Sequence, residues 1–324
     1  MRGTRIFELA KKALNEGLDS SDLYELASSP AQLWPIAMGI AGWIKNLRMG
    51  NSVWLCAIVN AKSGLCDQDC AFCAQAYANQ TGSPVYPLIS ADKILELADE
   101  ASHNRAAAFS IVTSGKTVSG RDFERILKMV GSLGGRFASI CASLGCLEKS
   151  QLEELKAAGL RRYHHNLEAS PSFYSKICAT RPYEMNFRTL VWAKEAGLEA
   201  CGGGIFGMGE SWKDRVDLLM ELKKADVDSL SLNFLIPIRG TPLETSKGVE
   251  PIEGLFCIAL ARLAHPKKHI IVCGGREDRL KDLQGAALIS GASAMMIGNY
   301  LTQPGRDASL DLEMIADLGL VPEK

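Results

Sequence analysis

The stretch Trp54-Leu-Cys-Ala-Ile-Val59 is the first of eight short apolar runs that alternate with amphipathic segments along the chain. A short apolar run is typical of a buried strand, and apolar residues at intervals of three and four are typical of a helix. The predicted strands are 54–59, 107–113, 136–142, 162–168, 198–206, 229–236, 269–274 and 294–298. The helices predicted between them are 92–103, 121–132, 148–158, 185–196, 211–225, 251–264 and 279–290.

Eight β/α units within about 250 residues match the size of a TIM-type (β/α)8 barrel, which is the fold we predict for this α/β chain. Glycine-containing joints at 158–160, 196–198 and 290–292 end helices and lead into strands, a common use of glycine. A doubly wound open sheet is the alternative. Both topologies place the active site at the carboxyl ends of the strands.

Residues 1–46 are predicted to form an N-terminal helical cap, in which Ser20-Ser21-Asp22 marks the start of a second helix. Leucines recur there at loose helical spacing, namely Leu9, Leu14, Leu18, Leu23, Leu26 and Leu33. Residues 47–324 are predicted to form a single catalytic barrel domain with a C-terminal tail.

The charge balance and the length of the apolar runs weigh against nucleic-acid and membrane partners. The chain has 324 residues, with 36 Lys and Arg against 37 Asp and Glu, and no basic stripe of the kind that binds nucleic acid. Charged residues interrupt the apolar stretch at 1–10, so we expect no secretory signal, and no apolar run approaches the roughly 18–20 residues that span a membrane. We therefore predict a cytoplasmic protein, in which the ten cysteines are metal ligands, catalytic or buried rather than disulfide-bonded.

Three thiols follow the first predicted strand in the run Cys66-Asp-Gln-Asp-Cys70-Ala-Phe-Cys73. Offsets of four and three residues place them on one face of a helix or tight loop, with Cβ atoms roughly 5–6 Å apart. Closed zinc and iron–sulfur sites normally have four protein ligands, so three thiols indicate a cluster with one open position. A zinc knuckle, a redox pair or simple burial is the alternative; the polar residues 67–69 and the lack of a second Cys-x-x-Cys motif weigh against it.

Cys141, Cys201 and Cys273 come from the third, fifth and seventh predicted strands, so a barrel lets them point into one cavity if their strand phases match. Each taken alone is better explained as a buried structural residue. Together with Arg276 they predict a second centre, because an arginine is a poor core residue unless it is paired or binds something anionic. The remaining thiols are predicted to be structural: Cys56, Cys146, Cys178 and Cys257.

The spacing Cys-x-x-x-Cys-x-x-Cys resembles the motif of the radical S-adenosylmethionine (SAM) enzymes. In that superfamily the three cysteines hold a [4Fe-4S] cluster, whose open iron binds the amino and carboxylate groups of SAM. The resemblance implies reductive cleavage of SAM to methionine and a 5′-deoxyadenosyl radical, chemistry that the cofactor supplies and the protein positions. It also implies an electron donor such as flavodoxin or ferredoxin.

Six further segments resemble the biotin synthase family, in order and at the family's spacing over about residues 50–310. They are Asn60-Ala-Lys-Ser-Gly-Leu-Cys66, Tyr163-His-His-Asn-Leu-Glu168, Ile177-Cys-Ala-Thr-Arg181, Gly203-Gly-Ile-Phe-Gly-Met-Gly-Glu210, Gly240-Thr-Pro-Leu243 and Gly274-Gly-Arg-Glu277. The resemblance implies a barrel, usually a homodimer, that converts dethiobiotin to biotin. Two deoxyadenosyl radicals in turn remove hydrogens from unactivated carbons, and an auxiliary iron–sulfur cluster donates the sulfur.

The family's functional residues carry over by position. Cys66, Cys70 and Cys73 would hold the first cluster. Asn166 and Glu168 would contact the SAM ribose, where a carboxylate accepts from vicinal hydroxyls. Asn233 would contact the ureido ring of dethiobiotin, since an amide is both donor and acceptor. A salt bridge at the barrel mouth is the alternative for Glu168, and a satisfied core amide is the alternative for Asn233.

The auxiliary ligand set departs from the family pattern. The better-known members use three cysteines and an arginine, matched here by Cys141, Cys201 and Arg276, but the remaining cysteine position holds Ser110. Cys273 stands where a serine is expected, so cysteine and serine have exchanged sites. A hydroxyl is a weak ligand beside a thiolate. We therefore predict an auxiliary cluster, [2Fe-2S] or larger, held by Cys141, Cys201 and Cys273, with Arg276 as ligand or neighbouring partner.

Two other positions depart from the pattern. His164 replaces an asparagine that approaches dethiobiotin, and Asn186 replaces an arginine that helps to bind the SAM carboxylate; Arg181 or Arg188 would compensate. His164 and His165 are not expected to share a zinc ion, because adjacent strand residues face opposite sides. The alternatives to sulfur insertion are a hydrogenase-maturase-like radical SAM enzyme and a non-catalytic zinc or iron–sulfur protein.

Overall fold

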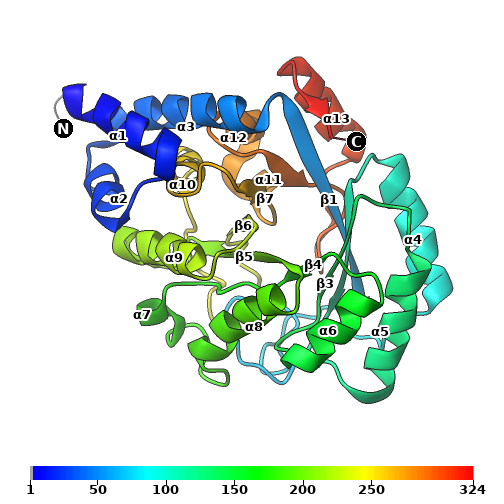
Figure 1. Ribbon diagram of the computed structural model, residues 1–324. Helices are drawn as coiled ribbons and strands as arrows, with labels where there is room; N and C mark the ends of the chain where they lie inside the picture. Colours follow the sequence, from blue (N-terminus) through cyan, green and yellow to red (C-terminus); the bar gives the residue numbers. More distant parts are fainter. Residues whose placement is uncertain (1–2, 324) are drawn as a thin grey trace.

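Eight parallel strands close into a barrel in the computed structural model, which describes residues 3–323 (Figure 1). The strands are β1 (Ser52–Lys62), β2 (Ala108–Thr113), β3 (Ser139–Ser143), β4 (Arg162–His164), β5 (Glu199–Phe206), β6 (Ser229–Phe234), β7 (His269–Val272) and β8 (Ala294–Met296). Each pairs with the next along the chain, and β1 pairs with both β8 and β2. The predicted (β/α)8 barrel is confirmed, and the doubly wound sheet is excluded. A short strand, β9 (Val321–Pro322), adds to the start of β1.

The helices surround this barrel, and the first of them precede it (Figure 1). The chain begins with α1 (Gly3–Glu16), α2 (Ser20–Ala27), a 3-10 turn (Ala31–Leu33) and α3 (Trp34–Met49). The others are α4 (Ala91–His103), α5 (Gly120–Ser132), α6 (Lys149–Ala157), α7 (Pro171–Tyr174), α8 (Tyr183–Glu195), α9 (Trp212–Lys224), α10 (Pro251–Ala264), α11 (Arg276–Leu280), α12 (Gln284–Ile289) and α13 (Ala308–Asp317). None of the helices within residues 3–323 is long and apolar enough to cross a membrane.

Three details of the sequence prediction are corrected. The predicted helix 279–290 is two helices, α11 and α12, joined by a 3-10 turn, because Lys281 has a positive φ of 51° that ends α11. The predicted strand 162–168 ends at His164, and Glu168 has a φ of 67°, which an extended strand does not allow. Asp19, rather than the following serines, caps α2 by accepting from the backbone N–H of Asp22. Residues 1, 2 and 324 of the predicted segments 1–46 and 47–324 lie outside the described residues.

Strand alternation separates the helix-facing core from the barrel interior. Along β1, Leu55, Ala57 and Val59 belong to the main apolar core that the helices cover. Because successive strand residues point to opposite faces, Trp54 and Cys56 point into the barrel. The outward strand residues therefore pack under the helices, and the inward ones face the space in which a site can form.

The cap helix α3 packs against α10 on the outside of the barrel. Trp34 at the start of α3 stacks on Phe256 of α10, with ring centroids 4.6 Å apart, and meets Trp212 edge-on at 5.4 Å. Nearby, the buried guanidinium of Arg262 donates to the carbonyls of Gly291 (2.9 Å) and Lys268 (2.7 Å). The Trp34 contacts attach α3 to the outer helices of the barrel, and Arg262 attaches α10 to the segments that precede β7 and β8.

Candidate functional site

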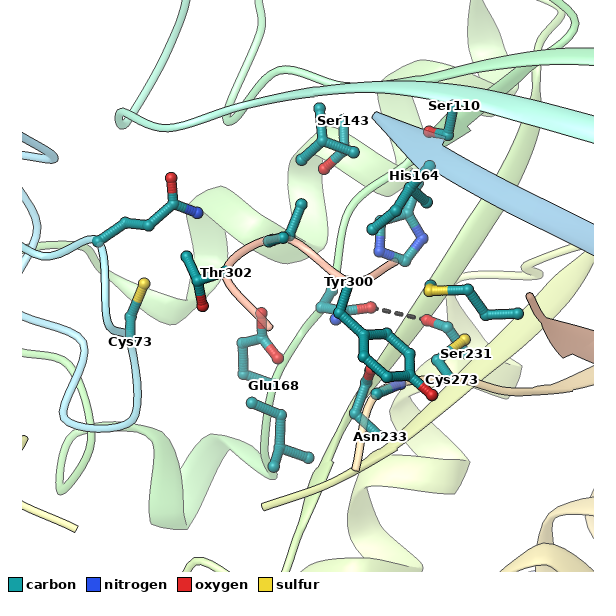
Figure 2. Close-up of a pocket in the computed structure, with 18 of the residues that line it drawn as sticks. Cys73, Ser110, Ser143, His164, Glu168, Ser231, Asn233, Cys273, Tyr300 and Thr302 are labelled. Atoms are coloured by element: carbon teal, nitrogen blue, oxygen red, sulfur yellow. Dashed lines mark hydrogen bonds between the residues drawn. The ribbon is translucent and has the colours of Figure 1, made fainter. Parts of the chain in front are cut away.

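A cavity of about 410 Å³ lies inside the barrel and opens at the carboxyl ends of the strands. Side chains from all eight strands line it, together with the loop after β1 and residues 300–303 near the C-terminus. Figure 2 shows Cys73 on one side of this cavity and Cys273 on the other, with Glu168 and Asn233 between them. The cavity is therefore the place where most of the residues singled out from the sequence meet.

The thiols of Cys66, Cys70 and Cys73 line the mouth of the cavity from the loop that follows β1. Backbone and side-chain hydrogen bonds hold this loop in turns rather than in a helix: the Asn79 amide donates to the carbonyls of Cys70 (3.2 Å) and Cys73 (2.8 Å). Burial raises the pKa of the Cys73 thiol to about 11, and the neighbouring Cys66 adds to that rise. A cationic metal centre would reverse this effect by stabilising the thiolates.

A second segment braces the loop from the side. The carboxylate of Asp69 accepts from the backbone N–H groups of Ala179 (3.0 Å) and Thr180 (3.1 Å), and the N–H of Ala71 donates to the carbonyl of Ile177 (2.8 Å). The polar residues between the cysteines thus tie the three thiols to the segment that leads to Arg181.

Arg181 is buried and faces the cavity, where its Nε donates to the Tyr174 hydroxyl at 3.1 Å. Asn186 does not take its place: it is fully buried and bonds His165 at 3.0 Å and Tyr174 at 3.0 Å. Arg188 is exposed and lies over the Trp192 ring, 4.7 Å from its centroid. Of the two compensating arginines considered from the sequence, only Arg181 is brought to the cavity.

Glu168 has an unusual backbone and an unpaired carboxylate oxygen. Its Oε2 is buried and finds no hydrogen-bond partner within residues 3–323, so the salt bridge considered as an alternative is absent from that part of the chain. Burial raises the pKa of Glu168 to about 7, although Arg181 opposes the rise. Asn166 lines the cavity beside it and accepts from the Ser231 hydroxyl at 2.8 Å. An unpaired buried acceptor of this kind fits a ligand hydroxyl.

Asn233 and His164 face the middle of the cavity (Figure 2). The amide of Asn233 accepts from the N–H of Gly274 at 3.1 Å and makes a longer contact, 3.4 Å, to the carbonyl of Gly204. It is therefore partly satisfied by backbone while its edge remains on the cavity wall. Burial and the charge of Arg162 hold the pKa of His164 near 4, even though Glu168 opposes them, so the imidazole is neutral at pH 7.

Cys141, Cys201 and Cys273 line the deep end of the cavity and pack in one apolar cluster. Ser110 faces the same space from β2, in register with Cys141. Burial raises the pKa of all three thiols. The predicted convergence of these cysteines is what the structure shows, and Cys273 lies immediately after β7 rather than within it.

Arg276 is not brought to this cavity. Its guanidinium pairs with Asp311 and with Gln284 in the C-terminal part of the chain. The physical reason is the turn at Gly275, whose φ of 79° starts α11 and directs the next residue away from the interior. The arginine that lines the cavity beside the thiols is Arg162 of β4.

Sequence reasoning missed two residues of the deep end, Arg162 and Cys56, and the loop residues Tyr300 and Thr302 near the mouth. The signal for Cys56 was available in its phase, because it alternates with Leu55 and Ala57, which face the core. No three His, Cys, Asp or Glu side chains in the described range 3–323 lie close enough to share one metal ion. The ligands of an iron–sulfur cluster bind different irons, so they need not meet at one point.

Two family models match the chain. One describes the Radical SAM superfamily and matches residues 62–235; the other describes a Biotin and Thiamin Synthesis associated domain and matches residues 231–321. The chain is 47% identical over 272 residues to the biotin synthase of Pelotomaculum thermopropionicum, covering 84% of this chain and 85% of that protein. It is 43% identical over 320 residues to the biotin synthase of Geotalea daltonii, covering 98% and 95%.

Solved structures share the fold at much lower sequence identity. The crystal structure of methylornithine synthase superposes with a TM-score of 0.83 at 19% identity, covering 98% of this chain and 97% of that one. The FeFe-hydrogenase maturase from Carboxydothermus hydrogenoformans superposes with a TM-score of 0.83 at 17% identity, covering 99% and 79%. Identities this low show the barrel fold alone.

Proposed function

The chain belongs to the biotin synthase family of radical SAM enzymes, and from this we propose that it inserts sulfur into dethiobiotin to form biotin. The observation that supports this most directly is one cavity with two separate sets of thiols, Cys66, Cys70 and Cys73 at the mouth and Cys141, Cys201 and Cys273 at the deep end. A SAM-cleaving enzyme needs the first set alone. Sulfur insertion needs both.

The residues at the mouth fit a [4Fe-4S] cluster and SAM. Three thiols would bind three irons as thiolates, and the unpaired Oε2 of Glu168 would accept from the ribose hydroxyls. Asn166 would share the ribose contact, and Arg181 would bind the SAM carboxylate. When bound, this cofactor pair supplies the 5′-deoxyadenosyl radical that activates an unreactive C–H bond.

The residues at the deep end fit an auxiliary cluster, [2Fe-2S] or larger, that donates sulfur. Cys141, Cys201 and Cys273 are buried together with few competing ligands, and Ser110 contributes only a weak hydroxyl. Arg276 would act on the cluster through its positive charge from outside the cavity, rather than as a ligand. Burial raises the pKa of Cys273, and the positive charge of Arg276 opposes that rise.

Dethiobiotin would bind between the two sets. Asn233 presents an amide edge for the ureido ring, and neutral His164 adds a donor or an acceptor on the same wall. The apolar residues Ile58, Ile205 and Met296 line the cavity around the position for its carbon atoms. Tyr300 and Thr302, at the mouth, would limit the entry of water, because a radical reaction must be kept away from solvent.

We also propose a cytoplasmic setting, a one-electron donor such as flavodoxin or ferredoxin, and a homodimer. The outer face of α3 exposes Ile36, Trp43 and Leu47, which share one side of the helix at intervals of seven and four residues. A second copy of this chain is the partner that would cover an apolar stripe of this kind.

An anaerobic reaction with SAM, a reductant and dethiobiotin, scored for 5′-deoxyadenosine and biotin, tests the function. Both products are expected. Deoxyadenosine without biotin, with both clusters loaded, would favour the maturase-like alternative. The absence of SAM cleavage in protein that has bound iron and sulfide would favour the non-catalytic binding protein.

A further inference from the structure

We infer that Cys56 is a fourth protein thiol of the auxiliary site, and that Arg162 is the cation paired with the cluster bound there. The inference rests on the proposed function and extends its ligand set, which so far contains Cys141, Cys201 and Cys273. Three observations support it: the register of the strands, the residues that line the cavity, and buried donors that lack acceptors.

Register places Cys56 at the same height in the barrel as Cys141. In a (β/α)8 barrel, the inward side chains of alternate strands share a layer of four. Cys56 of β1 is in register with Ala108 of β2, which is in register with Ser139 of β3. With the stagger of such a barrel, the residue at equal height two strands further on lies two positions later, which is Cys141.

The same step repeats around the barrel. Cys141 is in register with Arg162, and Arg162 with Glu199, so the step leads to Cys201. Cys201 is in register with Ser229, and Ser229 with His269, so the next step leads to Ile271. Ile271 is in register with Ala294, and Ala294 with Trp54, so the last step returns to Cys56. One layer therefore holds Cys56, Cys141, Cys201 and Ile271. Cys273 lies two residues beyond Ile271, in the next layer that the odd-numbered strands form toward the mouth. Cys56 is thus in the layer of two proposed ligands, which Cys273 is not.

The thiol of Cys56 faces the cavity rather than the packed core. Cys56 lines the cavity wall and packs against the apolar cluster that contains the other deep thiols, whereas its neighbour Leu55 does not line the cavity and belongs to the core under the helices. Burial and the proximity of Cys141 raise the pKa of Cys56, and Arg162 opposes that rise. A structural cysteine of the core would lie on the other face of β1.

Arg162 lies at the same end of the cavity on β4, between the strands of Cys141 and Cys201. Its Nε and Nη2 donate to the carboxylate of Glu199 at 3.0 and 2.6 Å, and its guanidinium lies 5.5 Å from the Trp54 ring centroid. Glu199 also pairs with exposed Arg161 at 2.8 Å, so its charge is shared between two arginines. Arg162 thus keeps positive charge for an anionic partner inside the barrel.

Two buried donors beside Cys56 and Cys201 make no well-formed hydrogen bond among the described residues, although each is close enough to its thiol to oppose the rise in the pKa of that thiol. They are the indole N–H of Trp54, two residues before Cys56 on the inner face, and the hydroxyl of Ser229, which is in register with Cys201. Buried polar groups are normally hydrogen-bonded, so unpaired donors indicate an acceptor in the space that they border. Inorganic sulfide and thiolate sulfur are acceptors of this kind.

The assignment is tested on full-length protein in which Cys66, Cys70 and Cys73 are replaced by alanine, so that only the auxiliary site can hold a cluster. This parent and its Cys56→Ala derivative are reconstituted anaerobically with ⁵⁷Fe and sulfide. Bound iron and sulfide, Mössbauer spectra and far-UV circular dichroism are then compared. The matched control is Cys146→Ser, because Cys146 is also half-buried but bonds His165 at 3.6 Å outside this layer.

Cys56→Ala is expected to bind less than half of the iron of the parent or to give a changed Mössbauer spectrum, with unchanged circular dichroism, while Cys146→Ser matches the parent. Equal iron and an identical spectrum in Cys56→Ala would overturn the inference and leave the three-thiol site in place. A parent that binds no iron, beside a wild type that binds one cluster only, would overturn the auxiliary site and the proposed function with it.

Arg162 is a positioning residue, and its role is tested by measuring the reduction potential of the auxiliary cluster. Loss of a buried cation destabilises the more negative, reduced state, so Arg162→Met is expected to lower the potential. Arg162→Lys is expected to restore most of the shift, because it keeps the charge without the planar fork. An unchanged potential in the methionine variant, with the cluster bound, would overturn this role.

Discussion

The backbone of Glu168 passes directly over Gly204, so closely that a Cβ on Gly204 would lie 2.5 Å from the Glu168 carbonyl oxygen. The two residues form an isolated parallel bridge, in which the N–H of Ile205 donates to that oxygen at 2.9 Å. This approach keeps Glu168 at a φ of 67° and turns its carboxylate into the cavity. The glycine at 204 therefore positions Glu168, which lies in the segment that follows β4.

Gly204→Ala is expected to weaken SAM binding by about tenfold or more, because the methyl group displaces Glu168 from its place. A tenfold loss corresponds to about 1.4 kcal/mol of binding free energy. The measurement is anaerobic equilibrium binding of SAM to cluster-loaded protein. Gly39→Ala is the control, since a Cβ there meets no atom within 4 Å. Unchanged SAM affinity in a folded Gly204→Ala protein would contradict this role for the glycine.

Glu168 is also expected to make the stability of the cluster-free protein depend on pH. Burial raises its folded-state pKa from 4.5 to about 7, so its favourable contribution is complete below about pH 4.5 and is lost as pH rises through 7. The free energy of unfolding of wild type relative to Glu168→Gln should therefore fall, by on the order of 2 kcal/mol, between pH 5 and 8. Urea titrations at four pH values measure the difference. A flat difference would show that Glu168 is solvated.

The barrel and the convergence of its cysteines were predictable because they depend on local patterns. Apolar runs identified all eight strands, and cysteines on alternate strands indicated a shared interior. The position of Arg276 was not predictable, because it depends on the turn at Gly275, where a Cβ would lie 1.9 Å from the Phe234 carbonyl oxygen. Contacts of that kind join segments far apart in the sequence.

Two residues at the deep end of the cavity could not be predicted for a related reason. Cys56 and Arg162 were missed because their relation to Cys141 is one of height in the barrel, and height depends on register between strands. Register between parallel strands is set by the packing of the whole barrel, since no short turn fixes it. Strand phase alone identifies which residues point inward, but not which of them share a layer.

Arg181→Met is expected to weaken SAM binding about 10- to 100-fold, in line with the 1.5–3 kcal/mol that a charged hydrogen bond contributes. Arg181 faces the cavity, whereas Arg188 is exposed over Trp192, so Arg188→Met serves as a control of equal chemistry. Binding of SAM to the cluster-loaded, unreduced protein separates affinity from turnover. Equal losses in the two variants would argue that neither arginine contacts the cofactor.

A double variant, Trp43→Glu with Leu47→Glu, is expected to be monomeric while it remains folded. Both side chains are about half exposed on α3, and two buried carboxylates would not be tolerated between two copies of this surface. Sedimentation velocity measures the association state. Tyr77→Glu, at an exposed position in the loop after β1, is the control. A wild-type protein that is monomeric at micromolar concentration would contradict the proposed dimer.

Asp311→Ala is expected to destabilise the protein by about 3–5 kcal/mol, because it leaves the guanidinium of Arg276 buried without its anion. The carboxylate lies on α13, is fully buried and also pairs with Arg306 at 3.3 Å, so it attaches the C-terminal helix to the end of β7. Urea denaturation of the cluster-free protein gives the difference. Asp317→Ala, on the exposed face of the same helix, should change stability by less than about 0.5 kcal/mol. The double variant Arg276→Met with Asp311→Leu should recover most of the loss, since an apolar pair removes both buried charges. A loss below about 1 kcal/mol in Asp311→Ala would mean that solvent reaches Arg276 once the carboxylate is removed.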